Sequence, residues 1–425
     1  MDMNRKNIAL WTLYDFANSI VVVVFFLYFS QWLVVDKGVS DFWYNMTFAL
    51  GSVLLLLTAP VLGAMADKTG RQQSYLNKIT VLTFIFFVLT SLAALFWSRQ
   101  VWIAALFFLI ANYLYQFSFV FYNALLSYIA PREKWGSVSG VGQAGNWLGQ
   151  IAGLVITLPL ASGAVYLIGE AGRAQTFLPA TIIFFILALP MLLFFKFPNL
   201  SRPPATLSSS GEGKIDWKGE YKLQWHLLRQ LLRAPSMGYF LLAYFFFNDA
   251  IITAANNFPI FLENVFGVSD NVKSMLFAGI LVTSAIGALI SGRVADKLGL
   301  KKTLMIVLGI WIVVFPAVGL IQSFPVFVGF CVIMGFMFGA VWTVTRAAMT
   351  ALCPPDQLNF GFSFYTLAER VSTFAGPLAW GAITGLLFPL GPLRYRIAMV
   401  AMAVFVAFGI WVLRKVEIDE YKVVL

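Results

Sequence analysis

Two copies of one short phrase decide the fold of this chain: Gly63-Ala-Met-Ala-Asp-Lys-Thr-Gly-Arg71 and Gly292-Arg-Val-Ala-Asp-Lys-Leu-Gly299, the second followed by Leu-Lys-Lys302. Each copy ends one long apolar run and precedes another. Each is therefore predicted to be a tight, charged turn between two membrane-spanning helices. A repeat of this kind indicates a tandem duplication.

Further echoes support the duplication. The stretch from Asn123 to Pro131 reappears from Arg346 to Pro354, and the region of Asp15 reappears around Asp249. Two like halves packed in a bilayer leave a cavity at their interface, which is typical of a secondary transporter.

The composition excludes a soluble class. The chain is 60% hydrophobic and 11% charged, and its mean hydropathy is +0.83, as expected for a multi-pass membrane protein. The net charge of the chain is +10. Its basic residues alternate with the predicted topology, so they indicate membrane orientation and contact with lipid, and no nucleic-acid partner is expected. Cys331, Cys353 and the single His226 cannot build a metal cluster or a disulfide framework, so we expect neither metal nor cofactor.

The apolar runs predict an all-α membrane protein with twelve transmembrane helices in two pseudo-symmetric six-helix bundles, because a bilayer core takes about 20 apolar residues per helix. No cleavable signal peptide is recognised at the N-terminus. The predicted spans are 8–35, 42–66, 75–97, 101–129, 136–162, 175–197, 236–262, 272–295, 302–322, 325–352, 359–388 and 392–413.

These spans divide the chain into four parts: an N-terminal bundle (1–197), a cytoplasmic linker (198–235), a C-terminal bundle (236–414) and a cytoplasmic tail (415–425). Placing both termini in the cytoplasm puts most of the 29 Lys and Arg on the inner side, as the positive-inside rule requires. In a prokaryote the membrane would be the plasma (inner) membrane. The basic residues left outside are Lys37, Arg99, Arg173, Lys273, Arg394 and Arg396.

The linker begins with a Pro- and Ser-rich segment, and its second part has helical spacing. Trp217, Tyr221 and Trp225 lie on an apolar face, and Lys218 and Lys222 on a basic one. This pattern predicts a helix on the inner membrane surface, with a solvated linker helix as the alternative.

The duplicated turn resembles the signature loop of the major facilitator superfamily. The opening Leu13-Tyr-Asp-Phe-Ala-Asn-Ser19, the stretch from Phe121 to Leu126, and Tyr365 through Gly376-Pro377 resemble the vacuole-effluxer (autophagy-related permease-like) branch. The resemblance implies two six-helix bundles and alternating access. In fungal vacuolar members it implies amino-acid export. Within the fifth span, the stretch Gly142-Gln-Ala-Gly-Asn-Trp-Leu-Gly149 lacks the Pro that many drug/proton antiporters carry there, so the sequence does not indicate antiport.

The duplicated carboxylates Asp67 and Asp296 are candidate conformational latches. Each can pair with a basic side chain or with a neighbouring helix N-terminus. The resemblance implies that Asp67 and Arg71 hold the cytoplasmic side closed, and ordinary turn chemistry is the alternative. The further gating candidates are Gly63 and Gly292 in the same phrases and Arg346 near the end of span ten.

Charged residues within spans are candidates for substrate binding or coupling, because a charge at the bilayer centre costs about 3 kcal/mol or more unless it is paired or hydrated. Asp249 lies in span seven, and Glu369 and Arg370 in span eleven. Arg370 is a candidate for binding a substrate carboxylate, and Asp249 and Glu369 are candidates for proton or amine binding. The alternative is a structural ion pair.

Polar residues of spans one and four complete the candidate site. Asp15 and Asn18 lie in span one, and Asn112, Gln116 and Asn123 share one face of span four. The resemblance implies that spans one and four line the transport path. An interfacial position for Asp15 and ordinary hydrogen-bonded helix packing for span four are the alternatives.

The sequence thus predicts a monomeric carrier in contact with membrane lipids that moves a small polar or zwitterionic solute, with an amino acid as the first candidate and proton coupling through Asp249 or Glu369. A lysolipid or other amphiphile carrier is the alternative within transport. A non-transporting receptor or scaffold is the alternative from another class. An enzyme is not expected, because no nucleophile and base cluster appears.

Overall fold

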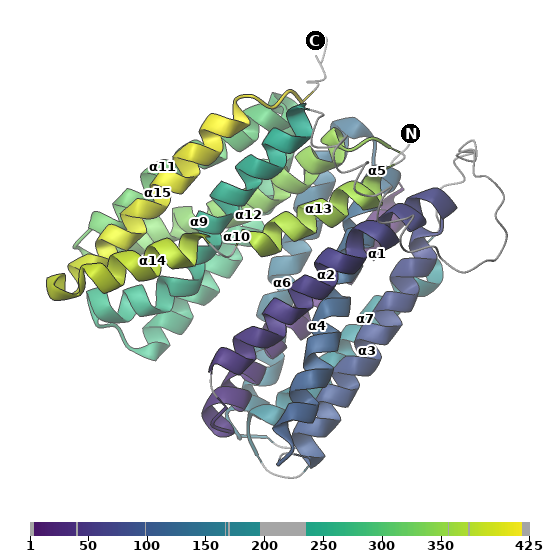
Figure 1. Ribbon diagram of the computed structural model, residues 1–425, viewed down its shortest axis with the longest axis horizontal. Coiled ribbons are helices and arrows are strands. Elements are labelled where there is room, and N and C mark those ends of the chain that lie inside the picture. The colour runs from purple at the N-terminus through teal and green to yellow at the C-terminus, as the bar shows by residue number, and fades with distance from the viewer. Residues whose placement is uncertain are drawn as a thin grey trace. The chain divides into compact units, whose positions relative to one another are not determined.

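The computed structural model describes residues 4–39, 41–97, 99–165, 167–168, 171–195, 235–355, 357–372 and 375–418. It divides into two compact units (Figure 1). Unit 1 comprises Met1–Pro131, Gly145–Gln224 and Pro355–Ser363, and unit 2 comprises Arg132–Ala144, Trp225–Pro354 and Phe364–Leu425.

The helices of unit 1 come mainly from the first half of the sequence. Within this unit α3 packs against α4, α1 against α7 and α2 against α4. The elements are α1 (Arg5–Val24), η1 (Phe25–Phe29), η2 (Trp32–Asp36), α2 (Asp41–Thr69), α3 (Gln72–Phe96), α4 (Val101–Ala124), α5 (Leu126–Ile129), most of α6 (Trp135–Ala161), η4 (Arg173–Thr176) and α7 (Phe177–Phe194).

The helices of unit 2 repeat the pattern. Here α10 packs against α12, α9 against α15 and α11 against α15. The elements are η3 (Arg132–Lys134), the start of α6, α9 (Pro235–Phe266), α10 (Asp270–Leu298), α11 (Leu300–Leu320), α12 (Phe324–Leu352), most of α13 (Leu358–Val371), α14 (Ala375–Leu386), η5 (Phe388–Leu390) and α15 (Leu393–Leu413).

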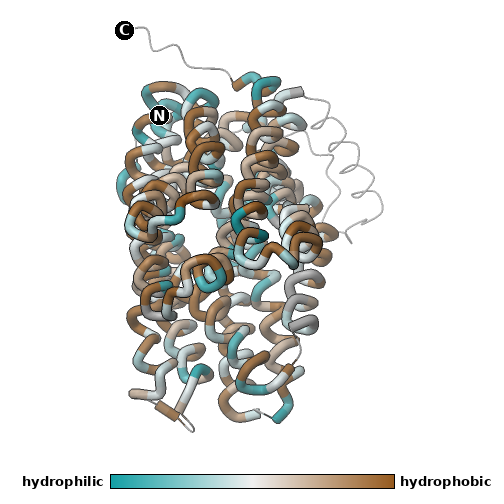
Figure 2. The backbone as a smooth tube through the Cα atoms, turned by 90° about the vertical axis from the view of Figure 1, so that its left-hand side faces the viewer, coloured by the Kyte–Doolittle hydropathy of each residue, from teal (hydrophilic) through white to brown (hydrophobic). Residues whose placement is uncertain are grey.

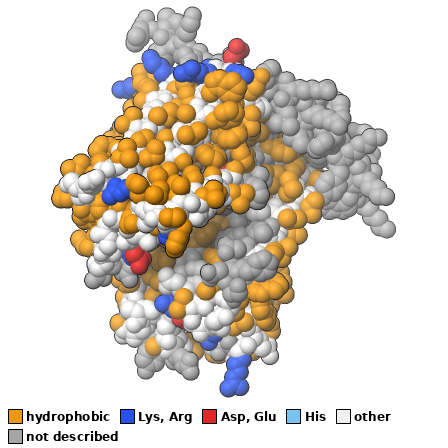
Figure 3. Space-filling view, turned by 60° about the vertical axis from the view of Figure 1, so that its left-hand side comes forward, with side chains coloured by type: hydrophobic (Ala, Val, Ile, Leu, Met, Phe, Trp, Pro, Cys, Tyr) orange, Lys and Arg blue, Asp and Glu red, His pale blue; other side chains and the backbone are white. Residues whose placement is uncertain are grey.

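Eleven of the helices described are long and apolar enough to cross a membrane. Hydrophobic residues dominate the backbone trace (Figure 2), and hydrophobic side chains cover most of the described surface on the face in Figure 3. Large apolar side chains such as Val35 and Val404, each 67% exposed, point outward. Exposure on this scale suits contact with lipid, because a soluble monomer rarely shows large contiguous apolar patches.

The predicted eleventh span, 359–388, differs from the expectation. It is not one helix: α13 ends at Val371 and α14 begins at Ala375. Each is shorter than the roughly 20 residues that a span requires, so the twelfth crossing is made of two consecutive helices. A break of this kind frees backbone groups that need partners inside the protein.

The duplicated turns form as the sequence predicts. Gly70 lies between α2 and α3 with φ of +64°, and Gly299 lies between α10 and α11 with φ of +92°. Only glycine adopts this left-handed region without a steric cost, so it ends one helix and lets the next begin at once. The two glycines occupy equivalent positions of the repeated phrase, three residues after Asp67 and Asp296.

Several predictions concern residues that the structure does not describe. The linker helix, His226 and most of the C-terminal tail lie outside the described residues. The bundle boundaries at 197 and 236 therefore stay predictions. One further feature of the units is that two short segments, 132–144 and 355–363, group with the unit formed mainly by the other half of the sequence.

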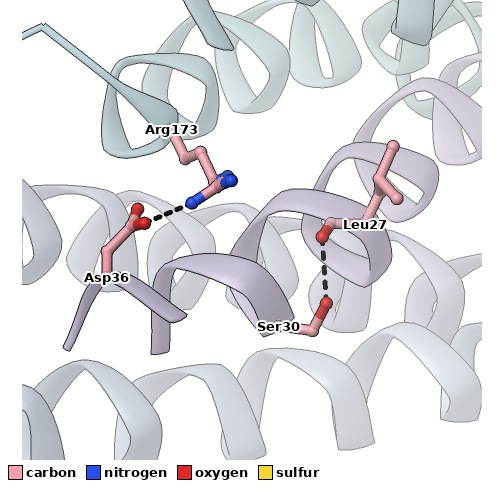
Figure 4. Close-up of polar contacts among 4 residues, drawn as sticks. All are labelled: Leu27, Ser30, Asp36 and Arg173. Carbon is pink, nitrogen blue, oxygen red and sulfur yellow. Dashed lines mark hydrogen bonds and ion pairs between the residues drawn. The ribbon is translucent and has the colours of Figure 1, made fainter. Parts of the chain in front are cut away.

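Close to the end of the first span, Arg173 forms an ion pair with Asp36 (Figure 4). Both belong to unit 1, and α1 continues toward Asp36 through the π-helical segments η1 and η2. Ser30, between these segments, donates its hydroxyl to the Leu27 carbonyl oxygen at 2.9 Å (Figure 4). The side chain thereby satisfies a carbonyl next to irregular helix turns.

Candidate functional site

The carboxylate of Asp67 caps the N-terminus of α13. Its Oδ1 accepts from the Asn359 backbone N–H at 3.2 Å and from Asn359 Nδ2 at 2.7 Å, and its Oδ2 accepts from the Phe360 N–H at 2.9 Å. The first N–H groups of a helix have no partner within the helix and carry partial positive charge, so a carboxylate is their natural acceptor. A helix N-terminus, one of the two alternatives that the sequence offered, is therefore a partner of this carboxylate.

Asp296 does the same for α6. Its Oδ1 accepts from the Gly136 N–H at 2.8 Å, and its Oδ2 accepts from the Ser137 N–H at 3.0 Å and from the Ser137 hydroxyl. In both cases the bound amides are those of the second and third residues of the helix. The duplicated phrase therefore makes the same contact twice, each time between residues from different halves of the sequence.

The glycines of the phrase allow these close approaches. A Cβ at Gly63 would lie 2.8 Å from the Asn359 carbonyl oxygen, and a Cβ at Gly292 would lie 2.9 Å from the Gly136 carbonyl carbon. Neither backbone atom can move away like a flexible side chain, so a larger residue would separate the carboxylate from its helix.

The two arginine gating candidates differ. Arg71 is exposed, and no contact of its side chain is seen within the described part of the chain. Arg346 is 7% exposed and donates from Nη2 to Gln143 Oε1 at 2.9 Å. It therefore bridges α12 and the early part of α6 inside unit 2, close to the contact of Asp296. The gating roles of both arginines stay predictions.

Asp15 is fully buried inside unit 1. Its Oδ2 accepts from the Tyr122 hydroxyl and its Oδ1 from Asn146 Nδ2, both at 3.0 Å. Tyr122 also stacks on Trp11 with ring centroids 4.6 Å apart. The carboxylate thus ties α1 to α4 and to α6. Asn18, one turn further on, donates to the Tyr14 carbonyl oxygen at 2.8 Å.

The polar face of α4 is buried and only partly satisfied. Asn112 and Gln116 are each 2% exposed, and Asn123 is 6% exposed. Neither Gln116 Oε1 nor Gln116 Nε2 has a hydrogen-bond partner in the described part of the protein, and the same holds for Asn112 Nδ2 and Asn123 Oδ1. A buried amide without a partner costs about 1–3 kcal/mol for each unsatisfied group, so these atoms are candidates for contact with a polar ligand.

Asp249 is fully buried in α9 and caps the second half of the broken span. Its Oδ2 accepts from the Gly376 N–H, the second residue of α14, at 2.6 Å, and its Oδ1 accepts from the Thr253 hydroxyl at 3.4 Å. A Cβ at Gly376 would lie 2.7 Å from Asp249 Oδ1. The break after α13 therefore supplies the partner that the sequence analysis sought for this carboxylate.

The neighbouring Asn248 forms a chain of contacts that the sequence analysis did not predict. Its Oδ1 accepts from Trp342 Nε1 at 3.0 Å, and its Nδ2 donates to the Ser372 hydroxyl oxygen at 2.7 Å. Asn248 and Asp249 thus hold the end of α13 and the start of α14 from one place on α9. Adjacent Asn and Asp inside an apolar span were the signal that could have revealed it.

Glu369 and Arg370, the charged pair of the eleventh span, lie on α13. Glu369 is half-buried, and its carbonyl oxygen accepts from the Ser372 hydroxyl at 2.8 Å. The side chain of Arg370 lies outside the described part of the structure. The substrate and coupling roles of these two residues stay predictions.

The sequence profile of the Major Facilitator Superfamily matches residues 3–154 and 240–423. A Bacillus subtilis relative, the uncharacterized MFS-type transporter YxiO, is 24% identical over 87% of this chain and 86% of its own length. Autophagy-related protein 22 of Pichia angusta is 23% identical over 38% of this chain and 31% of its own length. The crystal structure of the human organic anion transporter MFSD10 (TETRAN) superimposes with a TM-score of 0.75 at 14% identity, covering 97% of this chain and 100% of that one.

The helices, the turns and the comparisons together show that the protein is a multi-pass membrane transporter with the twelve-helix fold. The chain belongs to the Major Facilitator Superfamily. The predicted family and fold are confirmed, as is the similarity to the autophagy-related branch. Its relatives are transporters and not enzymes, as the sequence predicted.

We expect Asp67→Asn to raise amide hydrogen exchange in residues 355–363 about fivefold, because a helix cap contributes about 1 kcal/mol and an amide offers one acceptor oxygen where the carboxylate offers two. Exchange followed by mass spectrometry measures this. Asp296→Asn should act only on residues 132–144, which makes each variant the control for the other. Arg71→Gln removes a charge from the same turn, and because the Arg71 side chain makes no capping hydrogen bond to α3, this variant should leave both segments protected. Exchange that rises equally in both segments for either variant would contradict separate caps.

Gly376→Ala should lower the free energy of unfolding by about 1–3 kcal/mol, because the added methyl group overlaps the Asp249 carboxylate. Gly381→Ala on the same helix is the matched control, since no described atom lies within 4 Å of a Cβ there. Thermal melting of the two purified variants compares them. Equal melting temperatures would show that α14 does not depend on this cap.

Proposed function

We propose that this transporter moves a small zwitterionic solute, with an amino acid as the first candidate, by alternating access. The observation that carries the proposal is the amide of Gln116, which is 2% exposed and has a donor and an acceptor without partners in the described structure. A zwitterion brings one cationic donor and one anionic acceptor. Binding it would remove the cost of both unsatisfied groups.

The buried surroundings of Gln116 support the same class of substrate. Asn112 and Asn123 add one partnerless atom each on the same face of α4. Asp15 is held one helix away by Tyr122, the residue next to Asn123. Short amides and one carboxylate suit a compact polar solute. They offer little to an amphiphile, which needs a long apolar surface.

The capping contacts of Asp67 and Asp296 support alternating access. Each is a small set of charge-assisted hydrogen bonds that can break as a unit, and the two are chemically alike. We assign both to the cytoplasmic side, following the distribution of Lys and Arg, with both termini cytoplasmic. On this assignment the transporter opens to the cytoplasm when the two caps release α13 and α6.

A thermal-shift screen of the purified chain against amino acids, dipeptides, sugars and lysolipids tests the substrate class, because a ligand that binds the folded state raises its apparent stability. Stabilisation by an amino acid, followed by its uptake into proteoliposomes, is the expected result. Stabilisation by lysolipids alone would replace this proposal with the amphiphile carrier. Ligand binding without uptake would favour a receptor.

Gln116→Leu gives a sharper test, because it should weaken ligand binding at least tenfold while leaving the empty protein as stable as the wild type or more so. The variant removes two buried groups that have no partner, so nothing is lost until a ligand arrives. Asn18→Leu is the contrast, since the Asn18 amide already donates to Tyr14 and its loss should lower stability. Binding isotherms and melting curves on both variants separate the roles. Destabilised Gln116→Leu protein with normal binding would count against this site.

Proton coupling through Asp249 or Glu369 is the second part of the proposal. Protonation would cancel a charge that is costly inside the bilayer, and at Asp249 it would weaken the cap on α14. Uptake by proteoliposomes should then follow an imposed pH gradient. Asp249→Asn or Glu369→Gln should abolish that response while sparing substrate exchange at equal pH. If wild-type uptake does not respond to the pH gradient, facilitated diffusion or coupling to another ion would explain transport better.

A further inference from the structure

We propose that the ends of α9, α11 and α15 in unit 2 bind the head group of an anionic phospholipid, whose acyl chains lie along α15. This inference is independent of the transported solute. It rests on a basic cluster formed by Lys301, Lys302, Arg414 and Lys415, and on the apolar stripe that leads to it. We call the four residues the basic cluster.

The basic cluster brings four cations together near the start of α11 and the end of α15, with Glu417 as the acid among the described residues beside them and Asp419 and Glu420 following in the sequence. Lys301 and Lys302 begin α11, and Arg414 and Lys415 directly follow α15. The two pairs are adjacent in space, because Lys301 Nζ donates to the Arg414 carbonyl oxygen at 3.1 Å. Along 300–303 and 414–418 the one acidic residue is Glu417. The excess of positive charge favours an anionic partner.

The cluster is held in place by the segment that follows α15. The Glu417 N–H donates to the Ser236 hydroxyl oxygen at 3.0 Å, which ties this segment to the start of α9. Val416 and Ile418 are buried, whereas Arg414 and Lys415 are exposed. The backbone therefore presents the two cations outward from a fixed position, so little conformational freedom is lost when an anion binds.

Lys415 is positioned further by aromatic rings. Its Nζ lies 4.4 Å from the centroid of the Trp411 ring and 5.4 Å from that of the Tyr239 ring. Both rings are partly exposed, Trp411 at 52% and Tyr239 at 37%. Trp and Tyr beside a cation are typical of the level at which lipid head groups meet the hydrocarbon region.

An apolar stripe runs from the cluster along α15. Val404, Phe408 and Trp411 follow one another at intervals of four and three residues, which places them on one face of α15, and Lys415 follows just after the helix ends. Phe246 of α9 packs edge-on against Phe408 with ring centroids 4.5 Å apart, and Leu242 of α9 is also exposed. The stripe suits acyl chains that lie against α15 and α9.

Charge and apolar surface together select a lipid over a soluble anion. A free phosphate would use the cations and leave the stripe unused, whereas a phospholipid uses both. In Figure 3, Lys and Arg side chains gather along the upper edge of the face shown, directly above a hydrophobic surface. Such clusters at helix ends attract anionic head groups by about 1 kcal/mol for each Lys or Arg.

Fluorescence quenching in nanodiscs tests the proposal on the full chain. The signal of Trp411 is taken as the difference between the wild type and Trp411→Phe. Brominated phosphatidylglycerol should quench it more strongly than brominated phosphatidylcholine at the same mole fraction. This preference should fall about fivefold for each cation removed, as Arg414→Gln and Lys415→Gln are introduced singly and together.

The control is Arg293→Gln with Lys297→Gln, which removes two exposed cations from the end of α10, outside the basic cluster. It should leave the preference intact, and melting temperatures should show that all variants fold. Equal quenching by the two lipids in the wild type would overturn the proposal. So would an equal loss in the control pair, or relief of quenching by soluble glycerol phosphate, which would make the site one for free phosphate.

Discussion

A carboxylate that accepts the first amides of a helix is the interaction on which this structure depends. Asp67, Asp296 and Asp249 make it with α13, α6 and α14, respectively. The hydrocarbon core of a bilayer offers no hydrogen bonds, so a helix end at that depth needs a partner from the protein itself. A charged carboxylate meets that need and is neutralised in part by the helix dipole. One contact therefore solves two problems, the unpaired amides and the unpaired charge.

The three caps differ in what they can do. Asp67 and Asp296 lie in the last turns of α2 and α10 and are half-buried, so water can reach the carboxylates when the contact breaks. Asp249 is fully buried, and its helix begins in the middle of a broken span. If that contact broke while Asp249 stayed ionised, a charged carboxylate would be left buried without its helix partner. The first two contacts therefore suit reversible release, and the third suits control by a proton.

Asp15 in the first span shows how duplication permits divergence. Its equivalent, Asp249, binds a backbone amide at a helix break, whereas Asp15 binds the side chains of Tyr122 and Asn146 along unbroken helices. Because Asp15 is bound by side chains, α6 stays continuous there. Because Asp249 is bound by a backbone amide, Gly376 is required, since it has no Cβ to crowd the carboxylate. Nearby, α4 keeps amides without partners. Buried polar groups of that kind are retained where a ligand supplies what the protein does not.

Much of the fold followed from sequence because hydrophobic length and repeated motifs are local properties. The apolar runs predicted eleven of the long helices seen in the described residues, and the repeated phrase predicted both turns with their left-handed glycines. The break after Val371 was not predicted, because the apolar length of 359–388 fits one continuous span that contains Glu369 and Arg370. The contacts of Asn146 and Asn248 were also missed, since an amide on a helix face does not reveal which neighbour it meets.

The sequence by itself determined that this chain crosses the membrane many times and that it is duplicated, because these properties reside in composition and spacing. Its motifs also resemble those of the major facilitator transporters, the family to which the chain belongs. Only the tertiary structure decided which partner each carboxylate takes and which amides stay unpaired. Those outcomes depend on distances of about 3 Å between residues far apart in the chain. The spacing of a motif does not specify such distances until the helices have packed.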